Sequence, residues 1–350
     1  MTSDTLKTAD ELIAADLVSP ERRDEIDAVA SRYAVAITSD MAALVDAADA
    51  NDPILHQFVP SAAELTIAPE ERADPIGDEA FSPLKGIVHR YPDRVLLTPI
   101  HACAVYCRFC FRRETVGPGS EALRPDELAA AFDYIRTHPA IWEVIVTGGD
   151  PLLLSPRRLR GIVRALDAIP HVAVIRFHTR IPIVAPKRID AKLIAALESG
   201  KAVWIAVHAN HAREFGAAQR RALARLAGAG IPLVGQTVLL KGVNDNAAAL
   251  EDLFRAMVAN RIKPYYLHHP DLARGTGHFR TGIAEGQDLM RRLRGRVSGL
   301  CQPHYVLDLP GGHGKVPVGP CYARSDGEQW RIADPQGVEH VYPPLGRNGN

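Results

Sequence analysis

The 350-residue sequence has no apolar run of the ~18–20 residues that a membrane-spanning helix needs. Its N-terminal stretch, MTSDTLKTADELIAADL, has acidic residues early and no apolar core of the kind found in a secretory signal peptide. Lysine plus arginine and aspartate plus glutamate both number 41, so no surplus of positive charge indicates a nucleic-acid surface. These absences predict a cytoplasmic protein that binds neither membrane nor nucleic acid.

Cysteine is scarce, and its distribution argues against a disulfide-stabilised fold. The chain has five cysteines, an odd number in a long sequence, which favours metal binding or catalysis. Three of them lie in CAVYCRFC, at positions 103–110. The other two, Cys301 and Cys321, are isolated, and each is expected to be an ordinary small buried residue.

Two patterns alternate along the chain from residue 94 onward. Short apolar runs, which are typical of buried strands, are each followed by a segment with helical spacing. The runs occupy residues 94–100, 142–149, 171–177, 202–208, 231–240 and 263–269. This alternation predicts a parallel sheet covered by helices, with fewer units than a closed eightfold barrel. We therefore predict an α/β partial barrel of six units, with functional residues just after the strands.

Three regions follow from this interpretation. Residues 1–93 form an N-terminal helical region that wraps the barrel, residues 94–300 form the partial barrel, and residues 301–350 form a C-terminal segment. The arginine-rich stretch RRLRGRV, at 291–297, has helical spacing and is interpreted as a solvated helix face.

The cysteine cluster follows the first predicted strand. Thiolates are soft ligands that select zinc, copper(I) or iron–sulfur clusters. A structural zinc site needs four ligands, and His101 could supply the fourth, so zinc remains an alternative. Three thiolates suit a four-iron, four-sulfur cluster in which one iron is free to bind a small molecule.

Two glycine-containing segments add candidate ligand sites. TGGDP, at 147–151, ends the second predicted strand, where glycine lets a ligand approach the backbone closely. LDLPGGHGKVPVGP, at 307–320, is not a P-loop, because Val316 rather than Ser or Thr follows Lys315. The other interpretations are a surface turn, or a mobile glycine loop whose lysine carries pyridoxal phosphate covalently.

The spacing Cys-x3-Cys-x2-Cys, with Tyr106 and Phe109 before the second and third cysteines, resembles the radical SAM superfamily. From about residue 80 to 343 the chain is similar to a short form of the lysine 2,3-aminomutase family. The segments that carry this resemblance are GIVHRYPDRVLL, CAVYCRFCFRRE, VIVTGGDPL, RIPIVAPKRI, VGQTVLLKGVND, KPYYLHHPDLARGTGHFRT and LPGGHGKVPV. It implies a partial (β/α)6 barrel of radical SAM type with a C-terminal pyridoxal-phosphate lysine.

The resemblance also implies an activity and its cofactors. The expected enzyme is an isomerase that converts L-lysine to β-lysine by radical 1,2-amino migration. Its cofactors would be a 4Fe-4S cluster, S-adenosyl-L-methionine (SAM) and pyridoxal 5′-phosphate, and cleavage of SAM would give a 5′-deoxyadenosyl radical. An external electron donor such as flavodoxin or ferredoxin would reduce the cluster, and a homo-oligomer is compatible with this expectation.

Site residues are assigned by the same resemblance. The cluster ligands would be Cys103, Cys107 and Cys110. Lys315 would be the catalytic lysine that binds pyridoxal phosphate, with further contacts from Arg90, Tyr91 and Arg94. The SAM site would comprise Gly148, Gly149, Asp150, His208 and Gln236. Arg112 would pair with the α-carboxylate of the substrate, and the distal ammonium of lysine would lie between Asp271 and Asp308.

Some of these residues also have simpler interpretations, and related substrates remain open. His208 could be a packing residue, Arg112 could offset the cluster charge, and Asp271 and Asp308 could cap a loop and a turn. Arginine as substrate also suits two acids, whereas these acids would repel the side chain of glutamate. A non-catalytic iron–sulfur or zinc protein is the alternative outside this class.

The chain departs from the long members of the family at two places. The C-terminal cysteine group that binds structural zinc in long forms is missing from this sequence, so we expect no zinc and a different assembly. His313 stands where long forms have glycine, and His268 where they have a tyrosine near the pyridoxal phosphate. These two replacements are expected to change the geometry of the lysine–cofactor aldimine or the substrate relative to the long forms.

Overall fold

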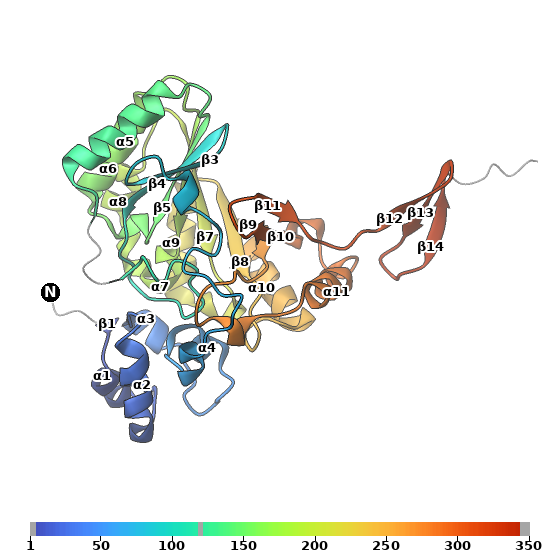
Figure 1. The fold of residues 1–350 in the computed structure, drawn as a ribbon, viewed down its shortest axis with the longest axis horizontal. Helices are drawn as coiled ribbons and strands as arrows, with labels where there is room; N and C mark the ends of the chain where they lie inside the picture. Colours follow the sequence, from blue (N-terminus) through green and yellow to red (C-terminus); the bar gives the residue numbers. More distant parts are fainter. Residues whose placement is uncertain (1–4, 118–121, 344–350) are drawn as a thin grey trace, which may run out of the picture.

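The computed structural model describes residues 5–117 and 122–343. Its centre is a nine-stranded sheet in the order β11-β10-β9-β8-β7-β6-β5-β4-β3. The six consecutive strands from β4 to β9 are parallel, and each overlaps one predicted apolar run. They are β4 (Arg94–Ile100), β5 (Glu143–Gly148), β6 (Val174–Thr179), β7 (Ala202–His208), β8 (Leu233–Val238) and β9 (Ile262–His268). The prediction of a six-unit partial barrel is confirmed (Figure 1).

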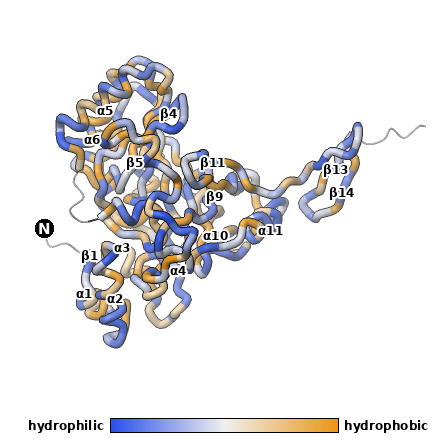
Figure 2. The backbone as a smooth tube through the Cα atoms, viewed as in Figure 1, coloured by the Kyte–Doolittle hydropathy of each residue, from blue (hydrophilic) through white to orange (hydrophobic). Residues whose placement is uncertain are grey.

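Helices connect successive parallel strands and cover the outside of the sheet. They are α5 (Pro125–Thr137), α6 (Pro156–Asp167), α7 (Ile181–Val184), α8 (Ala191–Ala196), α9 (Ala217–Gly228), α10 (Ala247–Ala259) and α11 (Ile283–Leu293). The start of α6 shows why they form here, since Ser155 caps the N–H of Arg158 and Pro156 takes the first position. Polar and apolar positions alternate along α5 and α6, as expected for helices with one buried side (Figure 2).

The sheet continues beyond the predicted six strands at both edges. β3 (Ile87–Tyr91) pairs antiparallel with β4, β10 (His304–Leu309) pairs parallel with β9, and β11 (Gly314–Pro317) pairs antiparallel with β10. Lys315 therefore lies on a strand, opposite Asp308, rather than on the expected mobile loop. Gly311 and Gly312 form the turn before it with φ values of +83° and +81°, which favour glycine.

The N-terminal region packs against one end of the barrel (Figure 1). It contains α1 (Ala9–Ala14), α2 (Arg23–Ala30), α3 (Ser39–Ala42), α4 (Pro53–Phe58) and the short strands β1 (Thr5–Leu6) and β2 (Ile37–Thr38). Its backbone binds the cysteine segment directly. The N–H of Tyr106 donates to the carbonyl of Ala36 at 3.1 Å, and that of Arg108 donates to the carbonyl of Gln57 at 2.9 Å. This region therefore helps to fix the conformation of the cysteine loop.

The C-terminal end of the chain forms a separate antiparallel sheet that stands away from the barrel (Figure 1). Its strands are β12 (Ala323–Asp326), β13 (Gln329–Ala333) and β14 (Glu339–Tyr342). Trp330 and Tyr342 are 48% and 63% exposed on it. Cys321, just before this sheet, is exposed, so the expectation that it would be buried was wrong, whereas Cys301 is buried as expected. Within residues 5–117 and 122–343, no helix has the length and apolar character needed to span a membrane.

Candidate active site

A cavity of about 640 Å³ lies inside the barrel and reaches the C-terminal ends of the parallel strands. Parallel strands bring the residues that follow them to one side of the sheet, and this is where barrel enzymes place their chemistry. The structure brings all the predicted site residues together on the cavity wall: Arg90, Tyr91, Arg94, Cys103, Cys107, Cys110, Arg112, Gly148, Gly149, Asp150, His208, Gln236, Asp271, Asp308 and Lys315.

The three clustered cysteines lie on the loop between β4 and α5, and none of them forms a disulfide. Burial raises the pKa of Cys110 to about 11 and holds the pKa of Cys103 well above its usual value. Such thiols are costly to ionise alone, and a cationic metal centre relieves that cost by taking the thiolate. Within the described ranges, no three His, Cys, Asp or Glu side chains converge tightly enough to hold one metal ion. An iron–sulfur cluster instead spreads its thiolate ligands over several irons, and three soft donors on one loop fit such a group.

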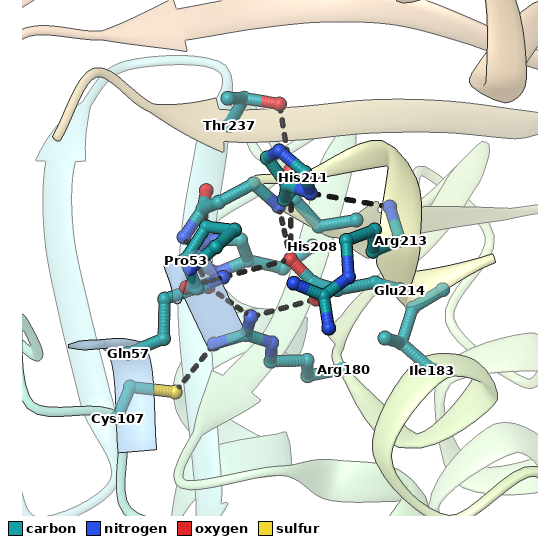
Figure 3. Close-up of polar contacts among 12 residues, drawn as sticks. Pro53, Gln57, Cys107, Arg180, Ile183, His208, His211, Arg213, Glu214 and Thr237 are labelled. Carbon is teal, nitrogen blue, oxygen red and sulfur yellow. Dashed lines mark hydrogen bonds and ion pairs between the residues drawn. The ribbon is translucent and has the colours of Figure 1, made fainter. Parts of the chain in front are cut away.

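Arg180, at the end of β6, reaches the cysteine loop and was not identified from the sequence (Figure 3). Its Nη1 donates to the Sγ of Cys107 at 2.9 Å. Its Nη2 donates to Gln57 Oε1 at 2.6 Å and to Glu214 Oε2 at 2.7 Å. Both partners are fully buried, one on α4 and the other after β7. A buried ion pair thus connects the cluster loop to the N-terminal region and to the barrel.

Removing this buried cation should weaken the whole fold. Replacing Arg180 with methionine is expected to lower the free energy of unfolding by about 3–5 kcal/mol, because Glu214 would remain buried without its cation. Chemical unfolding of the cluster-free protein measures this change. The double variant Arg180→Met, Glu214→Gln should recover part of the loss, since it removes the isolated charge. Stability within experimental error of the wild type in Arg180→Met would show that the pair is dispensable.

Gly148 and Gly149 let the backbone at the end of β5 approach the backbone at the end of β4 closely, because they have no side chain. Gly148 has a φ of +108°, and a Cβ on it would lie 2.4 Å from the carbonyl oxygen of Ile100. A Cβ on Gly149 would lie 2.2 Å from the carbonyl oxygen of Ala102. A side chain at either position would therefore displace the segment that leads into the cysteines.

The carboxylate of Asp150 accepts hydrogen bonds from residues of the barrel itself. Its Oδ1 accepts from the hydroxyl of Thr179, and its Oδ2 accepts from the backbone N–H of Arg180, both at 2.6 Å. Burial raises the pKa of this carboxyl, and these hydrogen bonds oppose the rise. A ligand at the TGGD segment would consequently meet backbone groups, while the Asp150 carboxylate fixes the turn after β6.

His208 and Gln236 are opposite each other in register, near the ends of β7 and β8. The Nε2 of His208 lies 3.1 Å from Asn210 Oδ1, and its ring centroid lies 5.6 Å from that of Phe109. Burial and the positive charge of Arg180 lower the pKa of His208 to about 3. His208 is therefore a neutral imidazole whose Nε2–H donates to Asn210.

Lys315 projects from β11 toward a group of polar and aromatic side chains. Its Nζ forms an ion pair with Asp308 and lies 3.3 Å from His268 Nδ1. Its backbone N–H donates to the Tyr91 hydroxyl at 2.7 Å, and the guanidinium of Arg94 lies 3.7 Å from the centre of the Tyr91 ring. An amine with arginines and an aromatic ring beside it fits an aldehyde cofactor that carries a phosphate.

The two unusual histidines lie in different surroundings. His268 is in the cavity, and burial with the nearby Lys315 charge holds its pKa well below the usual value, so the ring is neutral. Its Nδ1 can therefore accept a hydrogen bond from the Lys315 Nζ. His313 is exposed in the hairpin turn. Of the two replacements, His268 is the one in contact with the proposed cofactor lysine.

Both acidic and basic side chains line the cavity. Burial and the negative charge of Asp308 raise the pKa of Asp271 to about 7. Arg112 donates from Nη2 to Asp78 Oδ2 at 2.7 Å, and Asp78 was not identified from the sequence because it lies in a linker with no motif of its own. The cavity can therefore bind a carboxylate at the guanidinium of Arg112 and a cation at the acid pair, in one molecule that carries both.

Comparison with known proteins gives matches over most of the chain. A family model described as the radical SAM superfamily matches residues 97–254, and one described as lysine-2,3-aminomutase matches residues 290–343. L-lysine 2,3-aminomutase from Acetoanaerobium sticklandii is 40% identical over 320 residues, which cover 91% of this chain and 77% of the relative. The enzyme of the same name from Clostridium subterminale is 39% identical with the same coverage. Glutamate 2,3-aminomutase from Clostridioides difficile is 34% identical over 328 residues, covering 94% and 78%.

Proposed function

This chain belongs to the lysine 2,3-aminomutase family of radical SAM enzymes, and on that premise we propose that it is the isomerase that converts L-lysine to β-lysine. The observation that carries this proposal is that Arg112 and the two acids Asp271 and Asp308 line the same cavity. An α-amino acid with a terminal ammonium group needs both charges in a closed site.

The enzymes of this family work with a 4Fe-4S cluster, SAM and pyridoxal phosphate. When bound, the cluster and SAM supply a radical that removes a hydrogen atom, and pyridoxal phosphate lets the amino group migrate to the neighbouring carbon. We assign the cluster to Cys103, Cys107 and Cys110. We assign SAM to Gly148, Gly149, the backbone of Asp150, His208 and Gln236, and pyridoxal phosphate to Lys315, Arg90, Tyr91 and Arg94.

Lys315 is held ready for exchange between cofactor and substrate. Its position on β11, opposite Asp308, fixes the Nζ inside the cavity. The carboxylate of Asp308 and the neutral Nδ1 of His268 both accept a hydrogen bond from Nζ. These two acceptors orient the amine toward the cavity, where the cofactor and the substrate would meet it.

Lysine fits the acid pair better than glutamate does. Taking an ammonium group out of water is very costly unless carboxylates pair with it, and Asp271 and Asp308 provide this pairing. The same acids would repel the side-chain carboxylate of glutamate. Arginine is the second candidate, because its guanidinium also pairs with two acids. The lysine enzymes of Acetoanaerobium sticklandii and Clostridium subterminale, at 40% and 39% identity, are more similar to this chain than the glutamate enzyme is at 34%, which supports lysine, although the Bacillus subtilis lysine enzyme is also 34% identical.

The raised pKa of Asp271 predicts how catalysis depends on pH. The carboxyl is charged above about 7 and neutral below it, so its attraction for the ammonium group is present at high pH and lost as the pH falls. We expect kcat/KM for lysine to fall by up to about tenfold per pH unit below that value, because kcat/KM reports groups of the free enzyme. Asp271→Asn should show a low kcat/KM with no inflection near that pH. The same inflection in this variant would assign the titration to another group.

The proposal extends to the electron donor, the oligomeric state and the cellular compartment. An external flavodoxin or ferredoxin would reduce the cluster, since the clustered cysteines of this chain provide ligands for one cluster. The exposed Trp330 and Tyr342 support a homo-oligomer in which the C-terminal sheet makes contacts. Five free cysteines support a reducing compartment, the cytoplasm.

A further inference from the structure

Asp78 connects two arginines that the proposed function assigns to different ligands. Its Oδ1 accepts from Arg90 Nη2 and its Oδ2 accepts from Arg112 Nη2, each at 2.7 Å. The side chains of Asp78, Arg90 and Arg112 are 17%, 10% and 14% exposed, so solvent screens these contacts only weakly. Arg90 is assigned to the cofactor phosphate and Arg112 to the substrate carboxylate. One carboxylate therefore sets the positions of both guanidinium groups.

The backbone around Asp78 is itself held in place. The N–H groups of Asp78 and Glu79 donate to the two carboxylate oxygens of Asp74, each at 2.9 Å. Arg90 Nη2 also donates to the carbonyl of Ile76 at 2.8 Å. Residues 74–79 thus form a compact turn whose carboxylate cannot move far without breaking several hydrogen bonds.

This turn also packs against the hairpin that leads to Lys315. Gly77 has a φ of +70°, and a Cβ on it would lie 2.5 Å from the backbone nitrogen of Gly312. A Cβ on Gly312 would in turn lie 2.2 Å from Phe81 Cε2. The segment that holds Asp78 therefore contacts the cofactor lysine's own hairpin at van der Waals distance.

Asp78 leaves Arg112 able to bind a second carboxylate. A guanidinium has five N–H donors arranged in a planar fork, and Asp78 accepts from one nitrogen. The Nε and Nη1 of Arg112 donate to no other residue within 5–117 and 122–343, and the side chain lines the cavity. One edge of the guanidinium is thus free for the substrate, in an orientation that Asp78 determines.

We propose that Asp78 is a positioning residue that holds Arg90 and Arg112 at a fixed separation, and so sets where the substrate α-carboxylate lies relative to the cofactor phosphate. The inference rests on the proposed function, which assigns those two ligands. Without Asp78, the nearest remaining acid for Arg90 is Asp308, whose Oδ1 already lies 3.9 Å from Arg90 Nη1. The arginine would then compete for an acid that the substrate ammonium needs.

The test compares Asp78→Asn with the wild type in two measurements. Lysine binding is measured at equilibrium on protein that carries cluster and pyridoxal phosphate, without SAM or reductant. We expect the dissociation constant for lysine to rise about tenfold. The KM should rise by a similar factor while kcat changes less than about twofold, because the Arg112 contact stabilises the bound substrate and the transition state equally. Cadaverine, which is lysine without its carboxylate, should lose less affinity than lysine does, because it lacks the group that Arg112 binds and is affected only through Asp308. Asp133→Asn, which removes an exposed carboxylate paired with Arg136 on α5, is the matched control and should change nothing.

Two results would overturn the proposal. The first is an unchanged lysine dissociation constant in Asp78→Asn, and the second is equal weakening of lysine and cadaverine, which would indicate general damage to the site. If Asp78→Asn does not fold, Asp78→Glu takes its place. It keeps the charge but displaces both arginines by one methylene, and should weaken lysine binding by about threefold, a smaller step than loss of the charge-assisted bonds. Unchanged binding would count against the proposal.

Arg112→Lys tests the premise separately. If that variant binds lysine as well as the wild type does, the carboxylate site of the proposed function is wrong. If Arg112→Lys weakens lysine binding while Asp78→Asn does not, the proposed function stands and the inference about Asp78 alone fails.

Discussion

Replacing Lys315 with alanine should abolish the conversion of lysine to β-lysine, with a rate loss of at least about a thousandfold, as expected when a covalently acting residue is removed. Lys315 is the lysine on the cavity wall, and its Nζ is placed between Asp308 and His268. The product is measured by mass spectrometry under anaerobic conditions. The iron content should stay at the wild-type level, because in residues 5–117 and 122–343 the Lys315 side chain pairs with Asp308 and His268 and not with the cysteines.

The covalent role of this lysine has an independent readout. Borohydride reduction of protein loaded with pyridoxal phosphate should fix the cofactor on the peptide that contains residue 315, and peptide mass mapping detects it. Lys192→Ala, an exposed position on α8, is the matched control and should keep both labelling and activity. Labelling of another lysine, or a normal rate in Lys315→Ala, would contradict the assignment.

Replacing Cys107 with alanine should remove the cluster and, with it, reductive cleavage of SAM. Three thiolates leave one iron free for SAM, and with two the cluster lacks a protein ligand at a second iron. Arg180 would also lose the thiolate to which its Nη1 donates. We expect iron content and 5′-deoxyadenosine formation to fall to background after anaerobic reconstitution.

Cys321→Ala is the matched control for this experiment, since Cys321 is an exposed cysteine outside the cluster loop. It should bind iron and cleave SAM as the wild type does. Wild-type iron content in Cys107→Ala would exclude Cys107 from the ligand set and would favour the zinc interpretation of the loop, with His101 as a ligand.

The barrel could be predicted because apolar residues recur with a different spacing in its strands than in its helices. Each of the six parallel strands carries a short apolar run, and α6 begins at a serine cap and a proline that can be read directly from the sequence. The outer strands could not be predicted in the same way. β11 is short and starts with a glycine, so its pairing with β10 depends on tertiary contacts rather than on local pattern.

The motif residues were predictable, whereas the residues that hold them were not. The cysteine spacing and the glycine-rich segments are local signals, and they led to residues that line one cavity. Arg180 and Asp78 act through partners far away in sequence. Gln57, which holds Arg180, is 123 residues from it, and Asp78 contacts Arg112 across 34 residues. Asp150 shows the converse, since its motif was recognised but its carboxylate is bound within the fold.

The measurement that tests the central claim most directly offers L-lysine, L-arginine and L-glutamate separately to the reconstituted enzyme. It is made anaerobically with cluster, pyridoxal phosphate, SAM and a reductant, and β-amino acids are identified by mass spectrometry. The account predicts β-lysine from lysine and no β-amino acid from glutamate, because Asp271 and Asp308 attract an ammonium group and repel a carboxylate. Cleavage of SAM with no β-lysine, or β-glutamate as the main product, would contradict it.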